Sequence, residues 1–249
     1  MVGKMQNVIM DWREGIDMIV GLMDMSAMFD DEALYQRCMS VVSEDRRIKA
    51  AKYKNHKDSC RSAGAAVLLN VILGKYVEGE LTQHVAEDEV YDSHGLYVIK
   101  LTEAVDMVME KYNWDIRYSG KGKPEFDWEK IKESHNNNRG VCVDSIHFNM
   151  SHAGDYVVCV VADSCVGIDI EGKRRISESV ARRYFTQSER ESIKSDDDFF
   201  KLWTFKEALG KYSGQGIMSS IQSSEDDLED NVNVRRYEYD GYQICIVSG

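Results

Sequence analysis

Two carboxylates separated by one residue lie in a short apolar run, Val166-Gly167-Ile168-Asp169-Ile170-Glu171. Alternate side chains of a β-strand share a face, so Asp169 and Glu171 would lie together while Ile168 and its apolar neighbours face a core. Two carboxylates this close repel each other unless a cation lies between them. Mg²⁺ typically takes one or two carboxylates together with substrate phosphates and water. The same spacing also fits two solvated acids on an exposed strand, so it does not establish a metal site by itself.

A second group of charged residues has helical spacing. Trp203, Glu207 and Lys211 recur every four residues, so they would share roughly one face of a helix. Glu207 could add a third carboxylate to the ion, while Lys206 and Lys211 could contact phosphate oxygens as point charges. An ordinary ion pair between Glu207 and Lys211 on successive turns is the alternative explanation.

Ser151 and His152 follow a predicted strand and precede Gly154. A hydroxyl and an imidazole at a strand end could both donate hydrogen bonds to a phosphate. Taken alone, a Ser-His dipeptide is common and carries little information.

Charge is distributed unevenly along the 249 residues. The net charge is −12, which disfavours binding of bulk nucleic acid, because the phosphate backbone would be repelled. Positive charge is concentrated locally, which suggests a small polyanionic ligand, although solvated helix faces would give the same pattern. In one such segment the residues at helical spacing are Arg46, Lys49, Tyr53, Lys57 and Arg61.

The remaining composition indicates a cytoplasmic protein that does not interact with membranes. The apolar fraction is 43 %, no apolar run reaches the roughly 20 residues that span a bilayer, and the N-terminus does not resemble a signal peptide. The six cysteines are widely spaced and contain no C-x-x-C pair, which argues against a zinc site or a disulfide framework.

The elements that must position these residues can be predicted from hydrophobic periodicity. Strands are expected at 15–24, 94–100, 141–143, 145–150, 155–162, 166–170, 232–239 and 242–247. Helices are expected at 29–42, 43–75, 101–112, 176–185, 187–194 and 197–212, with Ser43 capping the second helix and Gly74 ending it. The order of these elements predicts an α+β fold with two similar halves, 1–163 and 164–249, related by pseudo-two-fold symmetry.

In this order the motifs resemble the 4′-phosphopantetheinyl transferase family, in its larger, pseudo-dimeric form. The family pattern is G-[IV]-D-[IVL]-E followed, tens of residues later, by W-x-x-K-E-A-x-x-K. The chain matches it completely, with Gly167 to Glu171 and Trp203 to Lys211. Upstream family elements are present as Gly122-Lys123-Pro124 and Asn149-Met150-Ser151-His152. The segment 76–120 is longer than the family's first half leads us to expect.

The resemblance implies a reaction and a set of roles. A serine hydroxyl of an apo acyl or peptidyl carrier protein attacks the β-phosphate of coenzyme A, and 3′,5′-ADP leaves. Mg²⁺, with Mn²⁺ as a substitute ion, is held by Asp169, Glu171 and Glu207, at a site between the two halves.

The remaining implied roles concern catalysis and coenzyme A binding. Glu207 is the candidate base, with metal-bound water as its rival, and Lys211 and His152 are the other catalytic candidates. Coenzyme A contacts are expected from Arg46, Lys49, Arg61, Lys123, Pro124, Ser151, His152, Lys206 and Lys211.

Two functions from other classes would use the same residues. One is a magnesium-dependent phosphohydrolase acting on coenzyme A or nucleotides, and the other is a non-catalytic coenzyme A-binding protein. The carrier protein itself is not identified by the sequence. We expect a monomer that docks its carrier through local basic and apolar residues, around Ile217 and Met218.

Overall fold

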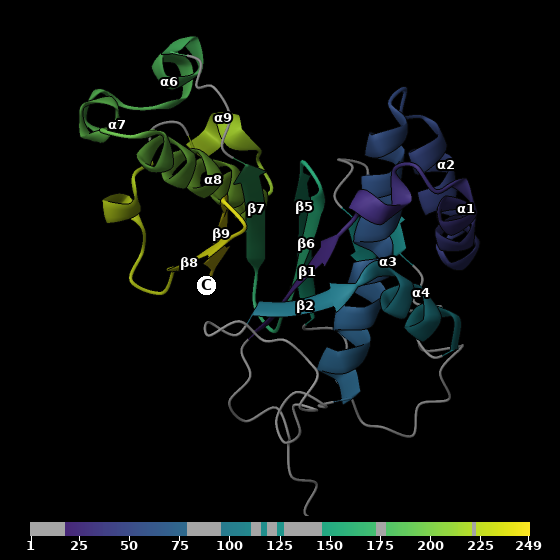
Figure 1. The fold of residues 1–249 in the computed structure, drawn as a ribbon. Helices are drawn as coiled ribbons and strands as arrows, with labels where there is room; N and C mark the ends of the chain where they lie inside the picture. The colour runs from purple at the N-terminus through teal and green to yellow at the C-terminus, as the bar shows by residue number, and fades with distance from the viewer. Residues whose placement is uncertain are drawn as a thin grey trace, which may run out of the picture.

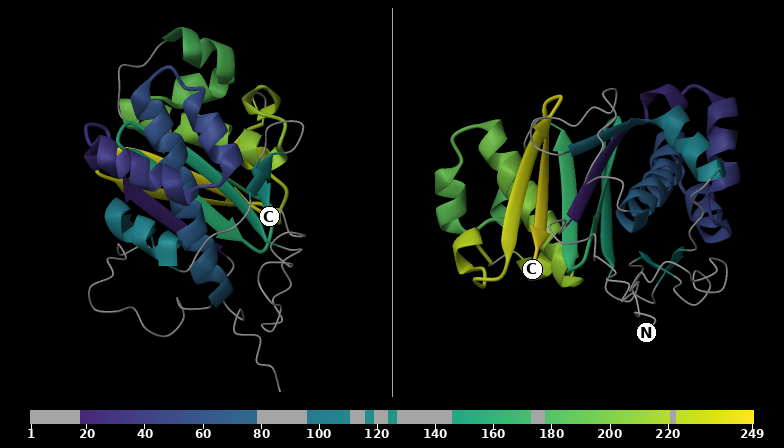
Figure 2. Two further views of the ribbon diagram at one scale, coloured as in Figure 1. Left: turned by 90° about the vertical axis from the view of Figure 1, so that its right-hand side faces the viewer. Right: turned by 90° about the horizontal axis from the view of Figure 1, so that it is seen from below.

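Two β-sheets stack face to face, and each has helices on its outer side (Figures 1 and 2). This computed structural model describes residues 18–78, 96–110, 116–118, 124–126, 146–172, 178–220 and 223–249. The chain therefore has an α+β fold whose layers, in order, are helices, sheet, sheet and helices.

The first sheet has the strand order β2-β1-β6-β5, with β1 parallel to β2 and the other pairs antiparallel. Its strands are β1 (Met18–Asp24), β2 (Leu96–Lys100), β5 (His147–Ala153) and β6 (Tyr156–Ala162). Alternation along β1 sends Ile19 and Met23 toward the helices, and Val20 and Leu22 toward the second sheet. Burial on both faces explains why β1 and β6 read as nearly continuous apolar runs.

Four helices cover the outer face of this sheet: α1 (Glu32–Val41), α2 (Glu44–Ala51), α3 (His56–Glu78) and α4 (Leu101–Glu110), with a 3-10 turn at Ser26–Met28. The helix predicted over 43–75 is thus two helices. Ser43 does cap α2, accepting from the Arg46 amide. The break follows because the side chain of Asn55 accepts from the Lys57 amide and starts a new helix, which continues past Gly74.

The second sheet is antiparallel, in the order β7-β9-β8, from β7 (Val166–Gly172), β8 (Asn233–Tyr239) and β9 (Tyr242–Ser248). Helix α8 (Asp196–Ser213) packs on its outer face. Around α8 lie α6 (Glu178–Tyr184), α7 (Gln187–Ser192), α9 (Ile217–Ser220) and a 3-10 turn at Glu225–Asp227. The predicted order of elements in 164–249 is confirmed.

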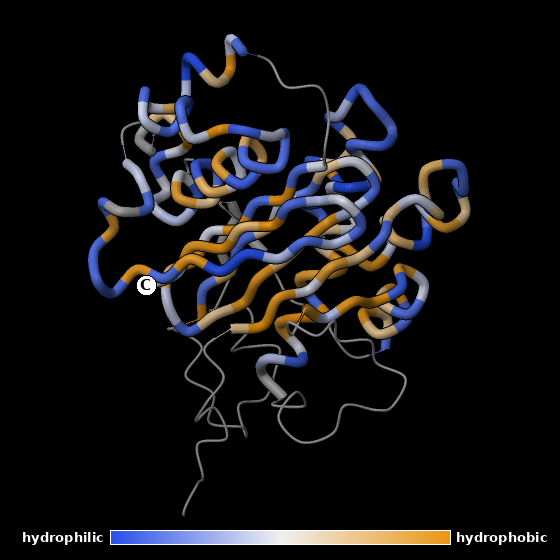
Figure 3. The backbone as a smooth tube through the Cα atoms, turned by 60° about the vertical axis from the view of Figure 1, so that its left-hand side comes forward, coloured by the Kyte–Doolittle hydropathy of each residue, from blue (hydrophilic) through white to orange (hydrophobic). Residues whose placement is uncertain are grey.

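The inner faces of the two sheets share one apolar cluster. Val158 and Val160 from β6 meet Ile168 and Ile170 from β7 and Ile246 from β9, all nearly inaccessible to solvent. In Figure 3 the paired strands are mostly hydrophobic, while turns and helix tips are hydrophilic. β5 and β7 lie side by side where the sheets meet, so residues from both sheets can reach one place.

Three further observations complete the fold. β3 (Ile116–Tyr118) and β4 (Pro124–Phe126) form a separate antiparallel pair. The strand predicted at 141–143 lies outside the described residues. No helix in the described ranges has both the length and the apolar character needed to cross a membrane.

Candidate active site

The close approach of helix α8 to strand β7 creates the site. A Cβ built on Gly167 would lie 2.2 Å from the carbonyl oxygen of Ala208 and 2.4 Å from the amide nitrogen of Tyr212. Only glycine fits there, because the obstructing atoms are helix backbone. The contact lets long side chains from the last turns of α8 reach the carboxylates of β7.

Lys211, Asp169 and Ser151 form a connected polar group. The Lys211 ammonium donates to Asp169 Oδ1 at 2.8 Å, to Ser151 Oγ at 2.8 Å and to the Ile168 carbonyl at 2.9 Å. Ser151 in turn donates to Asp169 Oδ1 at 2.7 Å. The ordinary Glu207–Lys211 pair considered above is therefore not the contact that Lys211 makes. The ammonium of Lys211 thus contacts β7 of the second sheet through Asp169 and β5 of the first sheet through Ser151.

The other two carboxylates lie around this group. Trp203 Nε1 donates to Glu171 Oε1 at 3.2 Å, linking α8 to the end of β7. Burial raises the pKa of Glu207, and the charges of Asp169 and Glu171 raise it further while Lys211 opposes them. The electrostatic neighbours of Glu207 are thus the two strand carboxylates.

The cation that these carboxylates suggest can be assessed from the atoms present. Asp169 is 5 % exposed, and its Oδ2 is buried without a hydrogen-bond partner within the described structure. A buried carboxylate oxygen without a partner is costly, and a cation is one ligand that would satisfy it. However, no three His, Cys, Asp or Glu side chains in the described ranges already form a group that could hold a metal ion. The donor set fits Mg²⁺ by charge and atom type, although it is not preassembled.

A cavity of about 490 Å³ opens beside Lys211. Its walls come from α2, α3, β5 and the end of α8, so segments far apart in the sequence contribute. The residues that line it are Arg46, Lys49, Tyr53, Ser62, Ala65, Asn149, Met150, His152, Gly210, Lys211, Gly214, Gln215 and Gly216. Burial lowers the pKa of Lys49, and neighbouring Arg46 lowers it further. The positive side chains on both sides of the cavity suit a ligand with several negative charges.

His152 lies on the wall that β5 contributes. Desolvation lowers its pKa, and the positive charges of Arg61 and Lys211 add to this effect, while Asp58 opposes it. A lowered pKa keeps the imidazole neutral near pH 7, so one ring nitrogen can donate and the other can accept.

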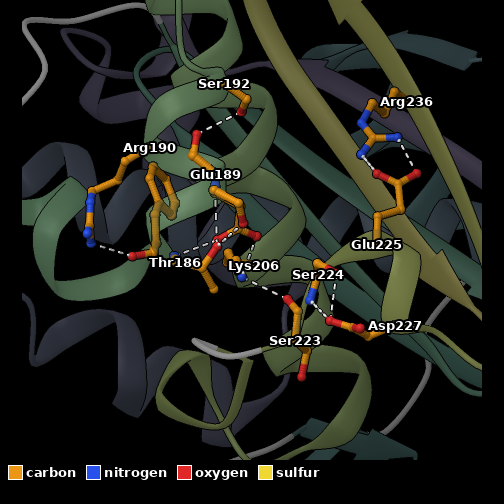
Figure 4. Close-up of polar contacts among 12 residues, drawn as sticks. Thr186, Glu189, Arg190, Ser192, Lys206, Ser223, Ser224, Glu225, Asp227 and Arg236 are labelled. Atoms are coloured by element: carbon orange, nitrogen blue, oxygen red, sulfur yellow. Dashed lines mark hydrogen bonds and ion pairs between the residues drawn. The ribbon is translucent and has the colours of Figure 1, made fainter.

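Lys206 does not lie at the cavity, contrary to the expectation that it contacts phosphate. Its side chain is fully buried, pairing with Glu189 at 2.8 Å and donating to the Ser223 carbonyl at 2.7 Å (Figure 4). Its neighbour Glu207 is 100° further round a helix, so adjacent residues face different surroundings.

Three further residues expected from the sequence to contact coenzyme A are placed differently or lie outside the described residues. Arg61 donates to the Gly154 carbonyl at 2.6 Å and pairs with Asp58, and it is not among the residues that line the cavity. Because α2 and α3 are separate helices, it does not share a helical face with Arg46. Lys123 lies outside the described residues, and Pro124 is placed only as the first residue of β4.

Several lining residues were not predicted. Ser62 accepts from Arg46 Nη1 at 3.4 Å, and Gly214 and Gly216 form the turn that closes the cavity at the end of α8. Both glycines have positive φ, 69° and 78°. The G-x-G spacing directly after an amphipathic helix was a readable signal of such a turn.

Comparison with known proteins identifies relatives of this chain. Residues 165–248 match the family model of the 4′-phosphopantetheinyl transferase superfamily. The 4′-phosphopantetheinyl transferase psf-1 of Bacillus pumilus is 41 % identical over 87 residues, which cover 32 % of this chain and 37 % of the relative. The 4′-phosphopantetheinyl transferase Sfp of Bacillus subtilis (strain 168) is 23 % identical over 223 residues, covering 85 % and 78 %.

A mammalian protein is also similar to this chain. The L-aminoadipate-semialdehyde dehydrogenase-phosphopantetheinyl transferase of Mus musculus is 32 % identical over 142 residues, covering 49 % of this chain and 43 % of the relative. The matches of higher identity thus span less than half of those relatives, and the match with Sfp spans most of both chains.

Proposed function

This chain belongs, through residues 165–248, to the 4′-phosphopantetheinyl transferase superfamily, and on that premise we propose that it transfers the phosphopantetheine arm of coenzyme A to a carrier protein. The acceptor is a serine hydroxyl of an apo acyl or peptidyl carrier protein. The serine oxygen forms a bond to the β-phosphorus. The bond between that phosphorus and the oxygen bridging to the α-phosphate breaks, and 3′,5′-ADP leaves.

One observation carries this proposal: a single cavity has basic side chains of α2 on one wall and Lys211, paired to Asp169, on another. A nucleotide with separate 3′-phosphate and pyrophosphate groups needs positive charge at two places. Arg46 and Lys49 are suited to the 3′-phosphate. Lys211 and His152 are suited to the pyrophosphate, and Ser151 orients Lys211 through its hydrogen bonds.

Asp169, Glu171 and Glu207 would hold Mg²⁺. When bound, the ion would neutralise charge on the pyrophosphate and orient it. The Asp169 Oδ2 atom and the mutual repulsion of the three carboxylates support this role. In the described side-chain positions, Lys211 supplies the positive charge beside Asp169.

The proton of the acceptor serine needs a base. Glu207 is the candidate among this chain's residues, because its raised pKa makes it a better proton acceptor than an ordinary carboxylate. Most of the acceleration would come from positioning the acceptor and stabilising charge, as in other phosphoryl transfers. We further propose that the active site lies between two halves, 1–163 and 164–249, of related build, since the cavity draws residues from both.

Mass spectrometry provides the test. The protein, coenzyme A, Mg²⁺ and an apo carrier protein are incubated, and the carrier is expected to gain the mass of the arm at its serine. A carrier variant with Ala in place of that serine serves as the control and should gain nothing. Release of 3′,5′-ADP without a carrier would instead indicate a phosphohydrolase, and coenzyme A binding without turnover a non-catalytic binder.

A further inference from the structure

The buried ammonium of Lys206 has no part in the proposed chemistry, yet it holds three segments together. Lys206 lies in the middle of α8 and is fully buried, as is most of its partner Glu189. Glu189 belongs to α7, where its other oxygen, Oε2, accepts from the Thr186 amide at 2.8 Å and caps that helix. Lys206 also donates to the Ser223 carbonyl at 2.7 Å, beyond the end of α9.

That second contact closes a loop of chain. The chain leaves α8 at Gly214, turns at Gly216, forms α9 and returns to Lys206 at Ser223. The turn has its own anchors, since the Gly214 amide donates to the Lys211 carbonyl and the Gly216 amide to the Gly210 carbonyl. The cavity wall at 214–216 is therefore secured by its own backbone hydrogen bonds, whereas Ser223 is held by Lys206.

The downstream side of the loop is also fixed. Arg236 of β8 forms two contacts with Glu225, and Ser224 donates from its amide and hydroxyl to Asp227 (Figure 4). Between these anchors α9 presents Met218, which is 59 % exposed, next to the turn that lines the cavity. Methionine is among the residues enriched at protein–protein interfaces, so α9 is a suitable contact for a protein acceptor.

We propose that Lys206 is a positioning residue: through Ser223 it holds α9 in place for the acceptor protein, without contacting either substrate. This inference rests on the proposed function, because it assigns α9 to the carrier side of that reaction. It predicts that loss of the tether weakens use of the carrier and leaves use of coenzyme A nearly unchanged.

Two variants separate this positioning role from a contribution to the stability of the fold alone. Replacing both members of the buried pair, Lys206→Met with Glu189→Met, removes the tether and both charges, and such apolar replacement often preserves stability. Glu189→Gln keeps the Lys206–Ser223 hydrogen bond but leaves the ammonium without its carboxylate, so Tm should fall. The control is Arg182→Ala, which breaks an ion pair with Glu178 whose side chains are 71 % and 80 % exposed.

Steady-state kinetics and hydrogen exchange are measured for each variant about 10 °C below its own Tm, within the range where the fold is intact. The double variant should raise the KM for the carrier roughly tenfold, the size of one hydrogen bond to a charged group, with the KM for coenzyme A changed less than about twofold. Amides of 217–220 and of Ser223 should exchange faster than in the wild type. Glu189→Gln and Arg182→Ala should keep the wild-type carrier KM.

The outcomes distinguish this inference from the function on which it rests. An unchanged carrier KM and unchanged exchange in the double variant would overturn the positioning role. If the wild type transfers no arm at all, the proposed function fails, and exchange of 217–220 and Ser223 alone then decides whether Lys206 holds α9 in place.

Discussion

At the scale of single residues, the surroundings of Glu207 disfavour its ionised form. Burial, Asp169 and Glu171 all raise its pKa. An acid whose pKa is higher in the folded state than in the unfolded state destabilises the fold once the pH rises above its unfolded pKa. Glu207→Gln should therefore raise the Tm of the metal-free protein at pH 7, and the gain should vanish below about pH 4, where the carboxyl is protonated in both states.

The same substitution should impair transfer. It removes the candidate base and one proposed metal ligand, so we expect the single-turnover rate to fall by at least roughly 100-fold. Thermal unfolding in EDTA at pH 7 and pH 4, beside rapid-quench transfer assays, checks both effects. A Glu207→Gln protein that is less stable in EDTA yet transfers at the wild-type rate would show that Glu207 is a structural acid.

At the scale of elements, the packing of α8 on β7 determines whether Lys211 can reach Asp169. Gly167→Ala would force the helix backbone outward, so we expect a loss of about 1–3 kcal/mol in the free energy of unfolding, as for other overpacked cores. The folded fraction should also lose most transfer activity, because the Lys211–Asp169 contact would lengthen. Chemical denaturation and active-site titration measure the two losses separately.

Gly21→Ala is the matched control for that experiment. The added Cβ would meet the side-chain end of Ile72 at 2.6 Å, which can rotate away more easily than helix backbone. Its stability loss should be smaller, and the folded protein should transfer at the wild-type rate. Equal effects of the two alanines on activity would contradict the role given to the α8–β7 contact.

Trp203 shows what sequence reasoning could predict about these elements. Its position on the face of α8 shared with Glu207 and Lys211 was predicted from the i, i+4, i+8 spacing. It is half-buried, stacks on Phe199 and meets Tyr184 of α6 edge to face, touching β7 through the Glu171 hydrogen bond.

Other features could not be predicted because they depend on contacts distant in sequence. The helical period predicts which face of α8 carries Lys206. It does not predict that Glu189 is the partner, because nothing in the local sequence marks a buried acid. The break between α2 and α3 rests on one Asn55 cap within a charged, otherwise helical run. Strands β6 and β9 were predictable, because nearly continuous apolar runs of that length fit buried strands, and β7 was predictable from its alternation of apolar and acidic residues.

At the scale of the whole molecule, coenzyme A binding should depend on the positive side chains that line the cavity. Lys49→Ala should raise the KM for coenzyme A more than it lowers kcat, because it would remove binding common to ground and transition states. 3′-Dephospho-coenzyme A should be affected less. The exposed Lys54, which is not among the lining residues, provides the control as Lys54→Ala. Equal responses of the two substrates would remove Lys49 from the 3′-phosphate.

The pH dependence of that KM follows from the lowered pKa of Lys49. A lysine with a lowered pKa loses its charge at a less alkaline pH than usual. The wild-type KM for coenzyme A should therefore rise as the pH increases toward the alkaline range, and the rise should be smaller in Lys49→Ala. Initial rates at several pH values and constant ionic strength test this expectation.

Divalent cations should affect the whole fold as well as activity. A ligand that binds only the native state raises its stability. Mg²⁺ should raise the Tm of the wild type, and this shift should disappear in Asp169→Asn, which removes a proposed ligand. EDTA should abolish transfer and excess Mg²⁺ restore it. Full turnover in excess chelator would contradict the metal assignment.

The apolar cluster shared by the two sheets has a consequence for synthesis on the ribosome. When residues 1–163 have emerged, β1 and β6 can pair, but the inner face with Val20, Leu22, Val158 and Val160 still lacks the cover that β7 and β9 provide. Exposed apolar sheet faces of this kind promote aggregation of nascent chains. A chain halted near residue 163 should therefore aggregate more readily than one extended through β9.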